Sequence, residues 1–159
     1  MHRLIIVFSL VFNFCVINSQ EKVEKKILPD ILILELKSIT QSDQKYRSII
    51  VENRESLSKK DKDSLWVLQD EIDINNTIRV IEIIKEYGYI SSSNSNSNFP
   101  MHIILMHTPN NLKSEVLELI EKENRAGRIV KSSYGLIKWH LEGRKEVKLD
   151  YFKKNDSTN

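Results

Sequence analysis

Apolar residues recur every three or four positions between residues 32 and 50, and this spacing predicts a helix. Pro29 and Asp30 stand just before it and are typical of a helix start. The apolar positions on one face are Leu32, Leu36, Ile39, Tyr46 and Ile50. Asp43 fills the gap in this series, because the steps then become four, three, four, three and four. The helix therefore carries a carboxylate on the face that it would bury.

A second helix is predicted from Ser64 to a C-cap at Gly88, and it is the most regular element of the sequence. The charged segment 52–63 is expected to be a solvated connection, with Asp63 as the N-cap of this helix. One face of the helix consists of Trp66, Gln69, Asp73, Asn76, Val80, Ile84 and Tyr87. Three polar residues thus stand in the middle of an apolar stripe, and both helices turn a carboxylate inward.

The middle of the chain holds a polar segment, an apolar segment and a third helix. Residues 91–98 read SSSNSNSN; this low-complexity run has no means of burying itself, so we expect a mobile loop inside the domain. Residues 99–107 are mostly apolar and should be buried, as either a strand or a short helix, before Pro109 ends the segment. A third helix is predicted from Asn111 to a cap at Gly127.

The C-terminal part of the sequence changes to a period of two. Two strands that flank a turn at 142–145 are predicted from the alternating residues Ile137, Trp139 and Leu141, then Val147, Leu149 and Tyr151. This pattern is typical of a β-hairpin. The predicted fold class is therefore mainly α, a small helical domain with a C-terminal β-hairpin, with α+β as the alternative.

The N-terminus has the layout of a secretory signal peptide. His2 and Arg3 precede an apolar run from residue 4 to residue 17, which is short for a membrane-spanning helix. Ile17 and Ser19 fit the −3 and −1 positions of a cleavage site, so we expect a signal peptide over residues 1–19. An uncleaved anchor and a lipid-modified Cys15 are weaker alternatives. The mature protein is expected to be extracytoplasmic, either periplasmic or secreted, with no stable membrane anchor.

Composition narrows the function further. The 159 residues include 24 Lys and Arg against 22 Asp and Glu, and these charges alternate along the chain. No basic cluster of the kind that binds nucleic acid is present, so we expect no nucleic-acid partner. Cleavage after Ser19 would remove the only cysteine, Cys15, and with it any disulfide or thiolate chemistry. Residues 20–159 suit a single domain.

His102 and His107 flank the apolar segment, but their spacing does not make them a ligand pair. Five steps place two side chains about 140° apart on a helix and on opposite faces of a strand. His107 is more promising by itself, because it closes a buried segment just before a loop. It is either a hydrogen-bonded histidine at the edge of the core or a functional base or ligand. His140 is expected on the solvated face of the hairpin.

The buried carboxylates need a partner, because burying an unpaired one costs on the order of several kcal/mol. Arg47 follows Asp43 at the spacing of an intrahelical ion pair. One interpretation is a structural network that fixes how the helices pack. The other is a polar pocket, in which Arg47 anchors an anionic substrate and Asp43, Asp73 and His107 are the candidate catalytic residues. The candidate ligand-binding residues are Gln44, Arg47, Gln69 and Asn76.

Metal and cofactor chemistry have little support in the sequence. Asp43, Asp73 and His107 together could hold a divalent cation, but no spacing motif favours it. The chain also lacks GxSxG, HExxH and a phosphate-cradling glycine loop. We therefore expect neither a metal nor a cofactor.

At these polar residues the chain resembles an uncharacterised bacterial family, the domain of unknown function numbered 6624. The residues that carry the resemblance are Asp43, Gln44, Arg47, Trp66, Gln69, Asp73, Asn76, Tyr87, Gly88, Tyr89 and His107. It covers about residues 32–127. The chain departs from the family pattern in the loop at 91–98 and in the C-terminal tail, so an active site that uses the tail would be incomplete. The resemblance implies the fold and the polar cluster but brings no known activity.

Two hypotheses follow for the function. The favoured one is an exported bacterial binding or interaction domain, whose ligand is an unknown small molecule or protein. The alternative is a small hydrolase-like enzyme that uses the paired aspartates and His107 as acid and base. The distances between His107 and the two carboxylates, and the space beside them, separate a site from a sealed network.

Overall fold

The computed structural model describes residues 26–92, 94–97 and 99–144. These residues form α-helices and a short 3-10 helix, and no strand occurs among them, so the predicted mainly helical fold is confirmed. The predicted signal peptide at 1–19 and second hairpin strand at 147–151 lie outside the described residues. None of the described helices has both the length and the apolar content that crossing a bilayer requires.

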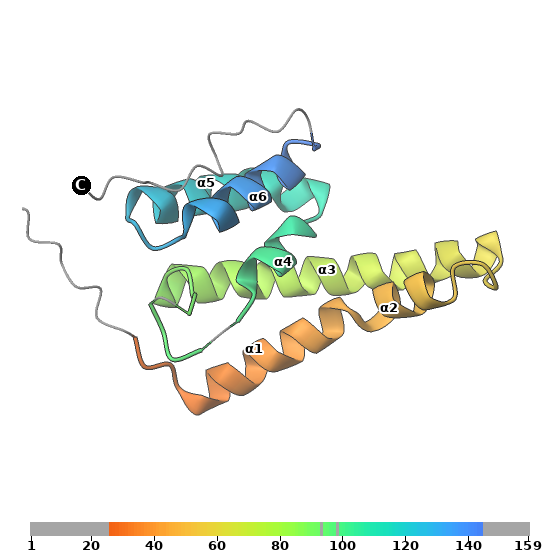
Figure 1. Cartoon of the computed structure of the whole chain (residues 1–159), viewed down its shortest axis with the longest axis horizontal. Helices are drawn as coiled ribbons and strands as arrows, with labels where there is room; N and C mark the ends of the chain where they lie inside the picture. Colours follow the sequence, from red (N-terminus) through yellow and green to blue (C-terminus); the bar gives the residue numbers. More distant parts are fainter. Residues whose placement is uncertain (1–25, 93, 98, 145–159) are drawn as a thin grey trace, which may run out of the picture.

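Helices α1 (Asp30–Asp43) and α2 (Lys45–Glu52) follow one another end to end along α3 (Lys59–Tyr87), as Figure 1 shows. Both run antiparallel to α3. The single helix predicted over this region breaks at Gln44. Beyond the break, α2, the turn at 53–58 and the first part of α3 extend away from the other helices (Figure 1), and we refer to residues 45–68 as the arm.

The ends of α3 explain its length. It begins at Lys59, earlier than predicted, because the Ser58 hydroxyl caps it by accepting a hydrogen bond from the Asp61 N–H at 3.2 Å. Asp63 is therefore inside the helix, and its prediction as N-cap is wrong. Gly88 is the C-cap, as predicted, with a φ of 75°. A side chain there would be strained and would meet the Arg128 guanidinium, which explains the glycine.

The remaining helices cover α3 on the side away from α1. They are α4 (Met101–Met106), the 3-10 helix η1 (Asn110–Leu112), α5 (Lys113–Arg125) and α6 (Lys131–Leu141). Helix α4 packs against both α3 and α6, and α5 packs against α6 (Figure 1). Fully buried residues that build the shared core include Leu36, Val80, Ile83, Met101, Leu105, Val116, Ile120 and Ile137. Of the two predictions for segment 99–107, the short helix is confirmed.

Helix α6 replaces the first strand of the predicted hairpin. The buried residues Tyr134, Ile137 and Leu141 are three and four positions apart and face the core on one side of the helix. The alternation of Ile137, Trp139 and Leu141 was misleading, because Trp139 is only partly buried on another side. The prediction of a strand at 137–141 is therefore wrong.

The serine–asparagine segment makes specific contacts. The Lys26 N–H donates to the Asn94 carbonyl at 2.9 Å, and the Leu28 N–H donates to Asn96 Oδ1 at 3.1 Å. Ser95 is only 3% exposed and forms a bridge with Lys26. The expectation that this segment has no means of burying itself is wrong for Ser95. Its mobility stays a prediction.

Candidate functional site

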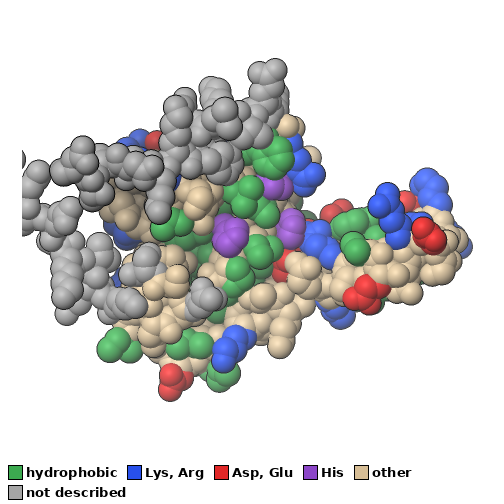
Figure 2. Space-filling model, viewed as in Figure 1, with side chains coloured by type: hydrophobic (Ala, Val, Ile, Leu, Met, Phe, Trp, Pro, Cys, Tyr) green, Lys and Arg blue, Asp and Glu red, His purple; other side chains and the backbone are tan. Residues whose placement is uncertain are grey.

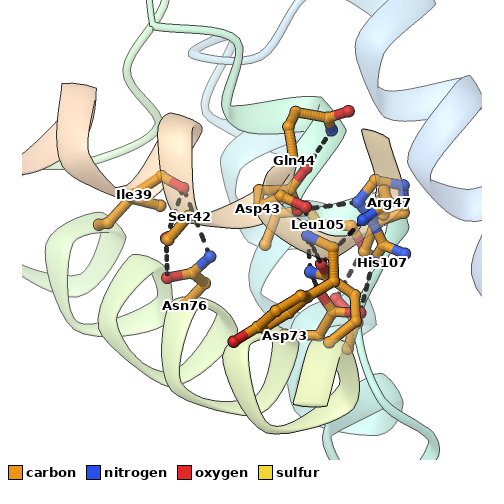
Figure 3. A network of polar contacts seen from close by, with 12 residues as sticks. Ile39, Ser42, Asp43, Gln44, Arg47, Asp73, Asn76, Leu105 and His107 are labelled. Atoms are coloured by element: carbon orange, nitrogen blue, oxygen red, sulfur yellow. Dashed lines mark hydrogen bonds and ion pairs between the residues drawn. The ribbon is translucent and has the colours of Figure 1, made fainter. Parts of the chain in front are cut away.

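Asp43 and His107 form a direct contact, although 64 positions separate them in the sequence. Asp43 ends α1 and is only 1% exposed, and its Oδ1 accepts a hydrogen bond from His107 Nδ1 at 2.9 Å. Its Oδ2 accepts another from the Gln44 side-chain amide at 2.5 Å (Figure 3). Both carboxylate oxygens are thus engaged. The imidazole is fixed through Nδ1, so Nε2 is the nitrogen that remains for a ligand or water.

The sequence suggested an ion pair between Asp43 and Arg47, but Arg47 pairs with Asp73. One Arg47 terminal nitrogen donates to Asp73 Oδ2, which joins α2 to α3. The break at Gln44 separates Asp43 and Arg47 into two helices, so the spacing of an intrahelical pair does not apply. The Arg47 guanidinium also lies 5.7 Å from the centre of the Trp66 ring, a cation–π distance.

The Asp73 carboxyl has an unusual electrostatic setting. Burial raises its pKa above the ordinary value. The hydrogen bond from Gln69, at 2.9 Å, and the charges of Arg47 and His107 act in the opposite direction but are outweighed. Perturbed carboxyl groups of this kind occur both in structural networks and in functional sites.

The two buried amides connect helices. Gln69 Nε2 donates to the Asp43 carbonyl at 3.0 Å, while its Oε1 accepts from the Tyr46 N–H at 3.0 Å and the Arg47 N–H at 3.3 Å. Asn76 receives a hydrogen bond from the Ser42 hydroxyl at 3.1 Å, on the side of the cluster away from His107 (Figure 3). Neither amide lines the pocket described next, so a ligand role for them stays a prediction.

An open pocket of about 370 Å³ lies beside this cluster. Its lining residues are Arg47, Asp73, Met106, His107, Thr108, Lys113, His140, Gly143 and Arg144. Figure 2 shows histidine side chains beside lysine and arginine side chains where the arm meets the rest of the molecule. Of the predicted site residues, Arg47, Asp73 and His107 therefore share one pocket, and Asp43 lies directly behind His107.

Three pocket residues were missed in the sequence: Lys113, His140 and Arg144. His140 was expected on the solvated face of a hairpin, but it lies on α6, partly buried, with Nδ1 3.1 Å from the Leu136 carbonyl. The helical spacing of the buried residues on α6 was the signal that could have placed it. Lys113 and Arg144 carry no local pattern, since only the fold brings them to His107.

His102 and His107 serve different surroundings, in agreement with the prediction that they are not a pair. His102 lines another pocket, near Phe99 and Pro100, and burial lowers its pKa. Among the residues that the structure describes, no three His, Cys, Asp or Glu side chains converge in a geometry that would hold a metal ion. Asp43 and Asp73 are instead used by His107 and Arg47.

Comparison of the chain with models of protein families, with curated proteins and with solved structures finds no match. The resemblance to the domain of unknown function 6624 therefore stays a prediction. The pocket combines an imidazole held by a buried carboxylate, a second imidazole, and cationic side chains around an open space.

Proposed function

We propose that this protein binds a small anionic ligand in the pocket beside His107. The volume of about 370 Å³ lies within the range of small-molecule sites, about 300–1,000 Å³. Arg47, Lys113 and Arg144 line the pocket against a single lining carboxylate, that of Asp73. Because Asp73 is already paired with Arg47, the charge that faces a ligand is mainly positive.

The observation that carries this proposal is the position of Lys113 and Arg144. Both line the pocket, and neither forms an ion pair with another residue that the structure describes. Cations left without a partner beside an open space provide the charge-assisted hydrogen bonds that carboxylates and phosphates accept. His107, anchored by Asp43, adds a further polar group at the same space.

Isothermal titration of the purified protein with inorganic phosphate tests the proposal. We expect one binding site, and we expect Lys113→Ala and Arg144→Ala each to weaken binding by about tenfold or more, since charged hydrogen bonds contribute about 1.5–3 kcal/mol. Lys59→Ala is the matched control, because Lys59 lies on the arm with its side chain 89% exposed. Binding that is absent, or that all three variants weaken equally, contradicts the proposal.

We further propose that binding takes place outside the cytoplasm. The support is the basic start, the apolar run and the small residue at Ser19, which together resemble a cleavable signal peptide. The resemblance to the domain of unknown function 6624 supports the same assignment of a polar cluster around Asp43, Asp73 and His107.

A further inference from the structure

Two histidines in the pocket are each hydrogen-bonded through Nδ1. His107 Nδ1 donates to the Asp43 carboxylate at 2.9 Å, and His140 Nδ1 donates to the Leu136 carbonyl at 3.1 Å. A carbonyl oxygen can only accept, so His140 Nδ1 carries a hydrogen. Nε2 is then the nitrogen of each ring that remains for proton transfer. Both side chains line the same pocket and come from different elements, the end of α4 and α6.

We propose that this pocket hydrolyses phosphodiesters with His107 as general base and His140 as general acid. The inference rests on the proposed anion-binding function, because Lys113, Arg144 and Arg47 must first hold the phosphodiester anion. A neutral carboxylic ester offers these cations no charge to bind. A phosphate monoester reacts through a loose transition state in which base catalysis contributes little.

The step is a direct attack by water. His107 Nε2 takes a proton from a water molecule, and the water oxygen forms a bond to phosphorus. The phosphorus–oxygen bond to the leaving alcohol breaks, and that oxygen receives the proton of protonated His140 Nε2. The products are a phosphate monoester and an alcohol, and solvent returns the two histidines to their starting protonation states. Water attacks phosphorus directly, so the step needs no covalent nucleophile. The Asp43 and Asp73 carboxylates are engaged with His107 and Arg47.

The surroundings of each ring assign its role. A carboxylate on Nδ1 stabilises the imidazolium that forms when Nε2 accepts a proton, which suits His107 as the base. His140 is held by a neutral carbonyl, and among the described residues no carboxylate is hydrogen-bonded to its ring. No such partner stabilises the imidazolium before Nε2 gives up its proton, which suits His140 as the acid. Asp43 does not line the pocket but contacts His107, so it is a positioning residue, which fixes the orientation of the His107 ring and its tautomer.

Two substrates separate the two roles. A nucleoside 2′,3′-cyclic phosphate has an alkoxide leaving group that needs a proton, whereas bis(4-nitrophenyl) phosphate releases a stable phenolate. We expect His107→Asn to lower kcat/KM at least 100-fold on both substrates. We expect His140→Asn to do so only on the cyclic phosphate, with less than a tenfold loss on the nitrophenyl ester. His102→Asn is the matched control and should leave both reactions unchanged.

The outcomes distinguish this inference from the proposed function. Phosphate binding without turnover of either substrate overturns the hydrolysis and leaves anion binding standing. The hydrolysis is also overturned if both histidine variants keep their turnover. It is likewise overturned if each variant loses the same activity on the two substrates. If wild type binds no phosphate, the anion-binding function itself fails. His107→Gln provides a second substitution at the same position in case His107→Asn does not fold. Circular dichroism of every variant shows whether a loss of turnover reflects a loss of folding.

Discussion

Asp73 is the residue at which the structural and functional interpretations of the cluster diverge most. Its carboxyl is paired with Arg47 and hydrogen-bonded by Gln69, which is what a structural network requires. It also lines the open pocket, and its pKa is raised by burial in spite of these partners. The folded protein therefore holds a proton on Asp73 more tightly than the unfolded chain does.

The stability of the protein should reflect this difference in proton affinity. Because the folded-state pKa of Asp73 is raised, unfolding releases a proton between the unfolded and folded pKa values, and rising pH favours the unfolded state. We expect the free energy of unfolding of wild type, relative to Asp73→Asn, to fall as pH rises from about 4, near the unfolded pKa, and then to level off. Urea unfolding at closely spaced pH values measures this difference.

Asp70→Asn provides the matched control, because Asp70 is an exposed carboxylate on the same helix. The fall with pH in the free energy of unfolding of wild type relative to Asp73→Asn must exceed any fall measured relative to Asp70→Asn. A difference between wild type and Asp73→Asn that grows with pH would contradict the assigned direction of the shift.

At the scale of elements, the joint between α1 and α2 positions the site. Gln69 on α3 donates to the last carbonyl of α1 and accepts from two of the first N–H groups of α2. These N–H groups have no partner within their own helix. The side chain is completely buried, so water cannot replace these contacts. The break turns Asp43 toward His107 and Arg47 toward Asp73.

Gln69→Ala is therefore expected to lower the free energy of unfolding by about 3 kcal/mol, because each buried group left unsatisfied costs about 1–3 kcal/mol. Gln41→Ala is the control, since Gln41 is exposed on α1 and should change stability by less than about 0.5 kcal/mol. Thermal or urea unfolding followed by circular dichroism measures both. A loss below about 1 kcal/mol for Gln69→Ala would show that the joint is held by other contacts.

The helices were predictable where the signal is local. Apolar residues at every third or fourth position predict α1, α3 and α5 from the sequence, because each helix buries one continuous face. The strand prediction at 137–141 failed because Ile137, Trp139 and Leu141 alternate over a stretch too short to exclude a helix. Packing against α4 and α5 favours the helix α6 here.

The candidate site was predictable only in part. Asp43 and Asp73 stand out because a polar residue in an apolar stripe conflicts with its surroundings, and His107 stands out at the end of a buried segment. Lys113 and Arg144 conflict with nothing in the sequence, since charged residues at exposed positions are the rule. Their relation to His107 depends on how α4, α5 and α6 pack together, which no local pattern contains.

At the scale of the whole molecule, the first 19 residues should determine where the protein works. When residues 1–159 are expressed in a Gram-negative host, we expect the protein in the periplasmic or extracellular fraction, with Gln20 as its N-terminal residue. Intact-mass spectrometry and N-terminal sequencing identify the cleavage position. Replacing Leu10 with Arg interrupts the apolar run and should keep the protein in the cytoplasm at full length. Uncleaved wild-type protein in the cytoplasm would contradict export.

The pocket draws its lining from α2, α3, α4, α5, α6 and the segments that follow α4 and α6, so its parts span positions 47–144 of the sequence. An unfolded or half-synthesised chain therefore has no version of it, however many of the residues are already present. An anion can therefore bind only the folded protein, and its binding stabilises the folded state over the unfolded state. At a concentration 100 times its dissociation constant, it would add about 2.7 kcal/mol to the free energy of unfolding. Occupancy of the pocket and lifetime of the protein would thus rise together.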